Sequence, residues 1–379
     1  MRVVVVGAGV LGASAAWHLA RAGVEVLAID NAQEGRATAA GAGTVCPWVS
    51  DDRDRPFYQL YTASGRYYQT LVAALAEDGE TDLGFRRSGA LIVSDDADDI
   101  AVYAGMLRRR RMRTPEMGEV QQLSAADARA LFPPLRDDLA GVLVSGGARV
   151  DGRRLTAALL RAAQRHGATL RHGEATLDTA GDKIGGVRVG TEQIAADLVV
   201  VTAGAWAPRL LAPLGIVLPV RPQRGQILHC RLPNQATEPW PVILPPGDHY
   251  LLAFEDSRIV AGATREDTAG FDHRVTVAGQ AELLLDALRI APGLADATVI
   301  ETRVGFRPAS VDGRPLLGAI PGLAGLLIGN GLGAGGLTMG PLAGRELAKL
   351  ALGQSTEQDL RPFAPLRASP VAAQLRPLR

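Results

Sequence analysis

The sequence is short of cysteine and lysine. Its 379 residues include two cysteines, Cys46 and Cys230, and two lysines, Lys183 and Lys349. Two distant cysteines form neither a disulfide framework nor a metal-binding spacing, so we expect a reducing, cytoplasmic setting. So little lysine leaves few candidates for Schiff-base chemistry. None of the six histidines has a partner at metal-ligand spacing, and we predict no metal site.

The chain also lacks an excess of charge and a long apolar run. Forty basic residues balance forty acidic ones, which gives no electrostatic reason to expect a nucleic-acid partner. No signal peptide is indicated, and glycines and prolines interrupt the uncharged residues 315–344, so we predict no transmembrane segment. The arginine cluster at 108–113 suits either a solvated helix end or contact with an anionic partner, which leaves peripheral membrane contact open.

What the sequence does contain is a complete strand–helix–strand signature in residues 2–30. Valines 3–6 predict a buried strand, and a G-x-G-x-x-G, an alanine-rich helix and a second strand ending at Asp30 follow. Gly7 permits the tight turn, Gly9 admits a pyrophosphate, and Gly12 lets the helix pack on the strand. The helix N-terminus attracts phosphate, and Asp30 suits a ribose diol. The alternative, a plain glycine turn, does not explain the terminal acid.

Two further stretches are rich in small residues. Residues 329–336 read GNGLGAGG between a predicted strand, 325–328, and a predicted helix, 337–352. Such a loop directs backbone N–H groups at a ligand, although small residues also suit close packing of a helix on a sheet. Residues 31–44 suit either backbone lying along a flat ligand or a flexible loop.

The remaining pattern predicts two intermixed sheets. Segments at both ends and in the middle of the chain are predicted to contribute strands to a parallel nucleotide-binding sheet. The segments between them are predicted to form a more antiparallel region. Helices are predicted at 57–75, 97–111, 124–131, 151–166, 278–291 and 337–352. Strands are also predicted at 89–94, 168–171, 184–189, 194–201, 225–231, 250–253, 258–263, 299–305 and 325–328.

Four segments resemble the flavin-dependent D-amino-acid oxidase, glycine oxidase and sarcosine oxidase family. They read VVVVGAGVLGASAAWHLARAGVEVLAID, DLVVVTAGAWAP, GFRPASVDGRPLLG and GNGLGAGGLTMGPLAGRELAKL. The resemblance implies an α/β fold in which a Rossmann-type FAD-binding domain is interleaved with an α+β substrate domain built on a mainly antiparallel sheet. The expected FAD-binding segments are 1–84, 145–218 and 302–353, the substrate-binding segments are 85–144 and 219–301, and 354–379 is expected to be a loosely ordered tail.

The resemblance also implies FAD and a set of cofactor-binding positions. A family branch attaches its flavin through a cysteine near the late arginine motif, and none lies there in this chain, so we expect noncovalent FAD. Beside the motif glycines Gly7, Gly9 and Gly12, the implied positions are Val10 and Leu11 at the pyrophosphate, Asp30 and Asn31 at the ribose, Ala37, Thr38, Ala42, Gly43 and Thr44 along the diphosphate and flavin, Ala175 at the adenine, Gly204 and Trp206 near the cofactor, and Leu332, Gly333, Ala334, Gly335, Gly336, Leu337 and Thr338 around the flavin ring.

Arg307 is the leading candidate for holding a substrate. A planar guanidinium between Phe306 and Pro308 suits a carboxylate, although an ion pair with Asp312 is an alternative. Tyr250 is a second candidate for the same carboxylate, and Trp48, His249 and Arg224 are further pocket candidates.

The resemblance implies oxidation of a C–N bond beside a carboxylate. The expected substrate is a small D-amino acid, glycine or an N-methyl amino acid, which becomes an imine and then a 2-oxo acid plus ammonia or amine. Oxygen, a quinone or another carrier is the expected electron acceptor. An NAD-dependent dehydrogenase, a flavin enzyme acting on a modified RNA base and a non-enzymatic nucleotide-binding module are alternatives.

Overall fold

The computed structural model describes residues 1–367, and the rest of the predicted tail, 368–379, lies outside the described residues. A six-stranded sheet forms its first half. The strand order is β18 (Leu316–Ala319), β19 (Leu326–Asn330), β12 (Leu198–Val201), β1 (Arg2–Val6), β2 (Glu25–Asp30) and β8 (Thr169–His172). The pairs are parallel except β18 with β19. Three distant segments of the chain therefore meet in one sheet.

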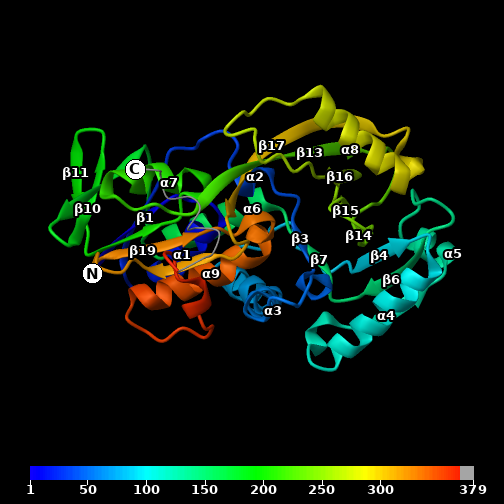
Figure 1. Ribbon diagram of the computed structural model, residues 1–379, viewed down its shortest axis with the longest axis horizontal. Helices are drawn as coiled ribbons and strands as arrows, with labels where there is room; N and C mark the ends of the chain where they lie inside the picture. The colour runs from blue at the N-terminus through cyan, green and yellow to red at the C-terminus, as the bar shows by residue number, and fades with distance from the viewer. Residues whose placement is uncertain (368–379) are drawn as a thin grey trace.

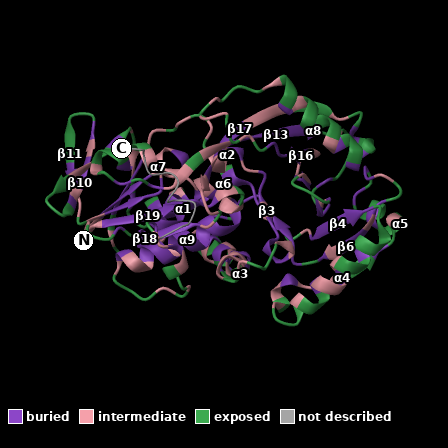
Figure 2. Cartoon of the chain, in the orientation of Figure 1, coloured by how far each residue is buried: buried purple, intermediate pink, exposed green. Residues whose placement is uncertain are grey.

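Both faces of this sheet are covered, as the buried strands in Figure 2 show. On one face lie α1 (Val10–Arg21), α3 (Arg55–Glu77), α6 (Gly152–Arg165) and α9 (Gly336–Ala351), whose apolar residues share one core. The other core contains a small sheet of β9 (Ala175–Ala180), β10 (Lys183–Val189) and β11 (Glu192–Ala195), together with α7 (Ala207–Leu211).

The second large sheet has eight strands. Its order is β17 (Thr298–Ser310), β13 (Val220–Arg231), β16 (Arg258–Gly262), β15 (Tyr250–Ala253), β14 (Val242–Leu244), β4 (Ala90–Ser94), β6 (Ala140–Val144) and β5 (Val120–Leu123). All its pairs are antiparallel except β14 with β4. Exposed faces of α4 (Ala97–Arg111), α5 (Ala125–Leu131) and α8 (Val277–Ile290) border it. The long strands β13 and β17 run from this sheet toward the first one (Figure 1).

The predicted helices are confirmed to within a few residues, and two of their caps are visible. Ser124 accepts a hydrogen bond from the Asp127 N–H at 3.2 Å, and Asp151 accepts from the Arg153 N–H at 3.0 Å. Short elements complete the chain: α2 (Ala37–Ala40), β3 (Thr44–Val45) and β7 (Ala148–Arg149).

The strand predicted at 194–201 is wrong as a single element. It is two strands, β11 and β12, in different sheets. The chain turns between them because the Ala196 N–H donates to the Gly185 carbonyl at 3.0 Å, whereas the Asp197 N–H donates to the Arg2 carbonyl at 2.9 Å. The patterns of β5, β6, β9, β14 and β18 were not recognised in the sequence.

Residues 354–367 do not form the loose tail that was expected. Phe363 is buried, Glu357 pairs with Lys349 at 2.6 Å, and Arg367 pairs with Asp312 at 2.7 Å. The two sheets otherwise draw on the chain segments assigned to two domains, although β17 crosses the boundary at 302, and we keep that division as a proposal. Within residues 1–367, no helix has both the length and the apolar character needed to cross a membrane.

Candidate active site

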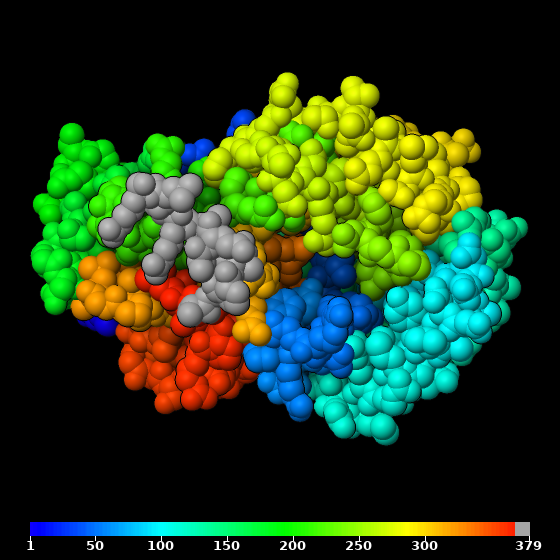
Figure 3. Space-filling model, in the orientation of Figure 1, coloured from blue at the N-terminus to red at the C-terminus, as the bar shows by residue number. Residues whose placement is uncertain are grey.

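A cavity of about 630 Å³ lies where the two large sheets meet. Its size is in the range of cofactor and small-molecule sites. The lining comes from the N-terminal glycine turn, parts of residues 29–50, the start of β9, the residues that follow β12, parts of β13 and β17, and the glycine loop before α9. Figure 3 shows a hollow at the centre of the molecule, with N-terminal residues in dark blue at its floor.

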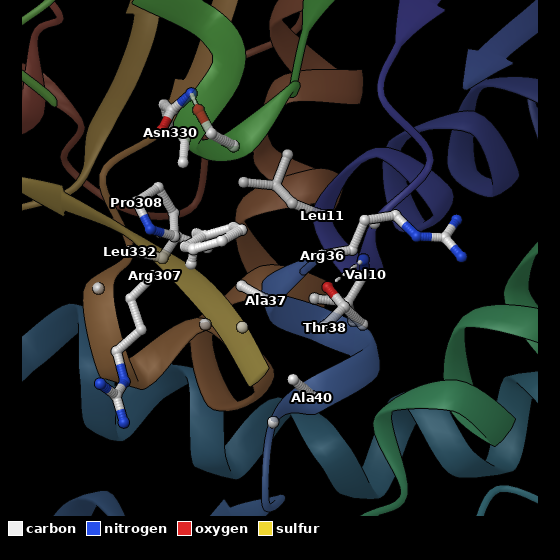
Figure 4. Close-up of a pocket in the computed structure, with 18 of the residues that line it drawn as sticks. Val10, Leu11, Arg36, Ala37, Thr38, Ala40, Arg307, Pro308, Asn330 and Leu332 are labelled. Carbon is white, nitrogen blue, oxygen red and sulfur yellow. Dashed lines mark hydrogen bonds between the residues drawn. The ribbon is translucent and has the colours of Figure 1, made fainter. Parts of the chain in front are cut away.

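One end of the cavity is built from the first glycine turn. Gly7 has a φ of +101°, and a Cβ atom on Gly12 would lie 1.9 Å from the Gly7 carbonyl oxygen. Helix α1 can therefore approach β1 only because residue 12 is glycine. Its N-cap, Gly9, has no side chain that could cap the helix, and the Val10 N–H donates to Thr38 Oγ1 at 3.2 Å at the cavity wall (Figure 4). With glycine at its N-cap, this helix N-terminus suits a pyrophosphate.

Asp30 is fixed at the same end. One carboxylate oxygen accepts from the Ala8 N–H at 2.7 Å, and the other accepts from the Ala32 N–H at 2.7 Å. Arg36 lies 3.3 Å from the second oxygen. Asp30 and Ala175, the first residue of β9, both line the cavity, as the predicted ribose and adenine contacts require.

A second helix N-terminus closes on the cavity from the other side. The turn Gly333–Gly335 leads into α9, whose N-cap Gly335 also lacks a side-chain cap. Asn330 fixes the chain segment that leads into this turn. Its side-chain amide donates to the Gly204 carbonyl at 2.9 Å, and its side-chain oxygen accepts from the Gly331 N–H at 2.7 Å. Leu332 also lines the cavity and lies near Pro308 in Figure 4. The donors therefore fit an elongated dinucleotide with its phosphates at α1 and its ring at α9.

Arg307 and Tyr250 lie together in this cavity, beyond the glycine loop. The Arg307 guanidinium donates to the Thr264 carbonyl at 3.0 Å and extends away from Arg36 in Figure 4. Burial lowers the pKa of Arg307 below its usual value, and burial raises the pKa of Tyr250. An arginine keeps its charge after such a shift, so the pair offers a cation and a neutral hydroxyl.

The alternative role for Arg307, an ion pair with Asp312, is not what the structure shows. Asp312 pairs with Arg367 instead. Within residues 1–367, no carboxylate lies within ion-pair distance of Arg307. Its charge is therefore available to a bound anion.

Two glycines make room for these side chains. A Cβ atom on Gly225 would lie 2.6–2.7 Å from three guanidinium atoms of Arg307, and one on Gly262 would lie 2.6 Å from the Tyr250 hydroxyl. Both glycines have strand positions, in β13 and β16. The backbone of the second sheet thus lies directly under Arg307 and Tyr250.

We expect Gly225→Ala to raise KM for a carboxylate substrate by about tenfold, because the added methyl displaces the guanidinium and weakens a charged hydrogen bond. The displaced group is the end of a flexible side chain, so the melting temperature should change little. Steady-state kinetics and thermal melting of the holoenzyme measure both effects. An unchanged KM would show that the guanidinium does not need this position.

Several predicted residues lie elsewhere. Gly12 and Thr338 do not line the cavity. Gly12 lets α1 pack on β1, as the motif predicts, and Thr338 Oγ1 donates to the Thr44 carbonyl at 3.0 Å. The prediction that Trp48 lines the pocket is wrong. Its buried side chain packs beside the cavity, whereas the next residues, Val49 and Ser50, line it. The prediction that Arg224 lines the pocket is also wrong. Its buried guanidinium pairs with Glu266 at 3.0 Å and with Asp272 at 2.9 Å.

The other predicted cofactor positions and His249 do line the cavity: Gly7, Gly9, Val10, Leu11, Asp30, Asn31, Ala37, Thr38, Ala42, Gly43, Thr44, Ala175, Gly204, Trp206, Leu332, Gly333, Ala334, Gly335, Gly336 and Leu337.

The sequence did not reveal other lining residues, among them Tyr61, Gly225, Arg265 and Asn330. The arginine cluster on α4 also has an unexpected member. Arg110 is only 11% exposed and donates to the carbonyls of Trp48 and Ser50, each at 2.8 Å. It therefore holds the loop that forms one cavity wall.

These features define the class of the protein. A doubly wound sheet with a G-x-G-x-x-G turn, a strand ending in an acid and two open helix N-termini on one cavity is a dinucleotide-binding fold. The family model described as "FAD dependent oxidoreductase" matches residues 2–350, and the chain belongs to this family. Its cofactor is FAD, and it is an enzyme, which displaces the NAD-dependent and non-enzymatic alternatives.

Individual relatives agree with this assignment. The chain is 49% identical over 366 residues to the uncharacterized oxidoreductase YurR of Bacillus subtilis, covering 96% of this chain and 98% of that protein. It is 34% identical over 370 residues to a glycine oxidase of Pseudomonas aeruginosa, with 96% and 98% covered. A crystal structure of iminodiacetate oxidase from Chelativorans sp. BNC1 has a TM-score of 0.94 and 52% identity, with 96% and 99% covered.

Proposed function

We propose that the protein oxidises the C–N bond next to the carboxylate of a small amino acid or N-substituted amino acid. The observation that carries this proposal is Arg307, a guanidinium without a carboxylate partner among residues 1–367, in the same cavity as the two helix N-termini that suit FAD. Glycine and iminodiacetate, named for two of the similar proteins, share one N–CH₂–COO⁻ unit, which supports the same choice of bond.

The residues of the chain bind and orient the substrate. Arg307 holds one substrate carboxylate through paired N–H donors, and the neutral Tyr250 hydroxyl donates a further hydrogen bond. This grip directs the adjacent carbon toward the glycine loop, where the α9 N-terminus stabilises negative charge. FAD, when bound, would accept the two electrons that are removed in the oxidation of the C–N bond. The resulting imine hydrolyses in water to a carbonyl compound and an amine.

The test is anaerobic mixing of the purified holoenzyme with glycine, N-methylglycine, iminodiacetate, and D- and L-alanine. We expect at least one of these compounds to bleach the visible flavin absorbance, and air or a quinone to restore it. Methylamine is the control, because it has the amine without the carboxylate and should leave the absorbance unchanged. Two results would contradict the proposal: methylamine bleaches the flavin as fast as the amino acids do, or none of the amino acids bleaches it.

A further inference from the structure

A short stretch after β16 continues the second sheet beside β13. Arg224 and Glu266 exchange backbone hydrogen bonds of 3.1 and 3.0 Å, and the Thr264 N–H donates to the Gln226 carbonyl at 3.2 Å. In this antiparallel register, residue 265 lies opposite Gly225. Residues 264–266 therefore have the alternating side-chain directions of a strand.

The side chains on either side of Arg265 turn away from the cavity. Thr264 Oγ1 accepts from the Gln226 N–H at 2.9 Å, and Glu266 accepts from the Gln226 side-chain amide at 2.8 Å. Alternation then directs Arg265 to the opposite face, and Arg265 does line the cavity.

Arg307 lies on that same face. Its guanidinium occupies the space over Gly225, the residue opposite Arg265, and it donates to the carbonyl of Thr264, the residue before Arg265. The two arginines are thus neighbours across strands, and the Arg265 charge adds to burial in lowering the pKa of Arg307. Like charges in such positions are unfavourable unless an anion lies between them or beside them.

The two guanidinium groups differ in depth. Arg307 is partly buried and has no carboxylate partner within the described residues, whereas the Arg265 side chain is 44% exposed and pairs with Asp248 at 2.9 Å. The Asp248 side chain is itself 60% exposed and follows Gly247, whose φ is +101°. The Asp248 carboxylate thus shows that the outer end of the cavity, at Arg265, can bind an anion. Because this ion pair is exposed to solvent, water weakens it.

We propose that Arg265 forms a second carboxylate subsite, so that the substrate is a secondary amine with a carboxylate on each side. The inner carboxylate binds Arg307, and the outer one replaces Asp248 at Arg265. The amine between them then lies beside the glycine loop. This inference rests on the proposed function and narrows it from amino acids in general to iminodicarboxylates.

The test uses glutarate, which has the length and two charges of such a substrate but a methylene in place of the nitrogen, so that no C–N bond can be oxidised. Butanoate has the same chain with one carboxylate. Calorimetric titration of the holoenzyme should give a dissociation constant for glutarate about tenfold or more below that for butanoate. Arg265→Gln should reduce this ratio to about one, and Arg265→Lys should restore part of it because the charge returns.

Arg221→Gln is the matched control, because Arg221 is an exposed arginine on β13 that pairs with Asp267 outside the cavity lining. It should keep the wild-type ratio. A wild-type ratio near one, or a ratio that survives in Arg265→Gln, would overturn the second subsite. The flavin-bleaching panel distinguishes the two failures. If only the second subsite is wrong, at least one amino acid of the panel still bleaches the flavin faster than methylamine does, and if the proposed function is wrong, none does.

Discussion

Arg307→Ala is expected to lower kcat/KM for a carboxylate-bearing amine by about a hundredfold to a thousandfold. The estimate follows from removing one partner of a desolvated, hydrogen-bonded charge pair, which costs about 3–4 kcal/mol. Most of the loss should appear in KM, because the carboxylate is bound in the ground state as well as in the transition state. Part should appear in kcat, because a substrate without its anchor presents the C–N bond in more orientations. Stopped-flow flavin bleaching over a range of substrate concentrations separates the two.

Arg307→Lys keeps the charge but loses the planar fork, so it should recover only part of the activity. Arg221→Ala, which removes an exposed arginine outside the cavity, should behave as the wild type. FAD content must be measured in each variant, since cofactor loss would imitate substrate loss. If Arg307→Ala holds its FAD and keeps its kinetic constants, Arg307 is not the carboxylate anchor.

The geometry of the proposed cofactor end could be predicted from the sequence because its signals are local. Residues 7–12 specify a tight turn, an open helix N-terminus and a close helix–strand contact within one short segment, and Asp30 marks the end of the next strand. The α9 loop is a second local signal of the same kind. Both depend on backbone geometry that glycine permits, and glycine is visible in a sequence.

The proposed substrate end depends on contacts between distant segments, and these have no local signal. Gly225 matters because Arg307 lies over it, and Gly262 matters because Tyr250 does. Arg265 becomes interesting only after the sheet register places it opposite Gly225. An isolated glycine in a strand or an arginine in a loop does not reveal such a neighbour.

The same limit explains the corrections. Trp48 lies next to cavity residues in the chain, but the short turn at 47–49 directs the indole into the core beside β4 and β6. Arg224 lies on β13, which pairs with the strand that carries Arg307, yet strand alternation places the Arg224 side chain on the opposite face, where Glu266 and Asp272 neutralise it. Which of two arginines is free depends on carboxylates that lie more than forty residues away in the chain.

Gly12→Ala is expected to give a protein that is purified without FAD. The added Cβ atom would lie 1.9 Å from the Gly7 carbonyl oxygen and 2.4 Å from Thr202 Oγ1, and the first of these is backbone that cannot rotate aside. Helix α1 must move away from β1, so its N-terminal N–H groups leave the phosphate position. Overpacking of this kind costs about 1–3 kcal/mol or more, and about 1.4 kcal/mol already weakens binding tenfold. The ratio of flavin to protein absorbance measures the loss directly.

Thermal melting separates a displaced helix from a misfolded chain. We expect Gly12→Ala to melt several degrees lower than the wild-type apoprotein, at roughly 2–4 °C for each kcal/mol, and still in a single cooperative step. Gly105→Ala is the matched control, because its new Cβ would meet only Arg109 Nη1 at 3.5 Å at a partly exposed position of α4, where alanine favours the helix. That variant should keep full FAD. Full cofactor occupancy in Gly12→Ala would mean that the first glycine turn does not hold the pyrophosphate as its geometry indicates.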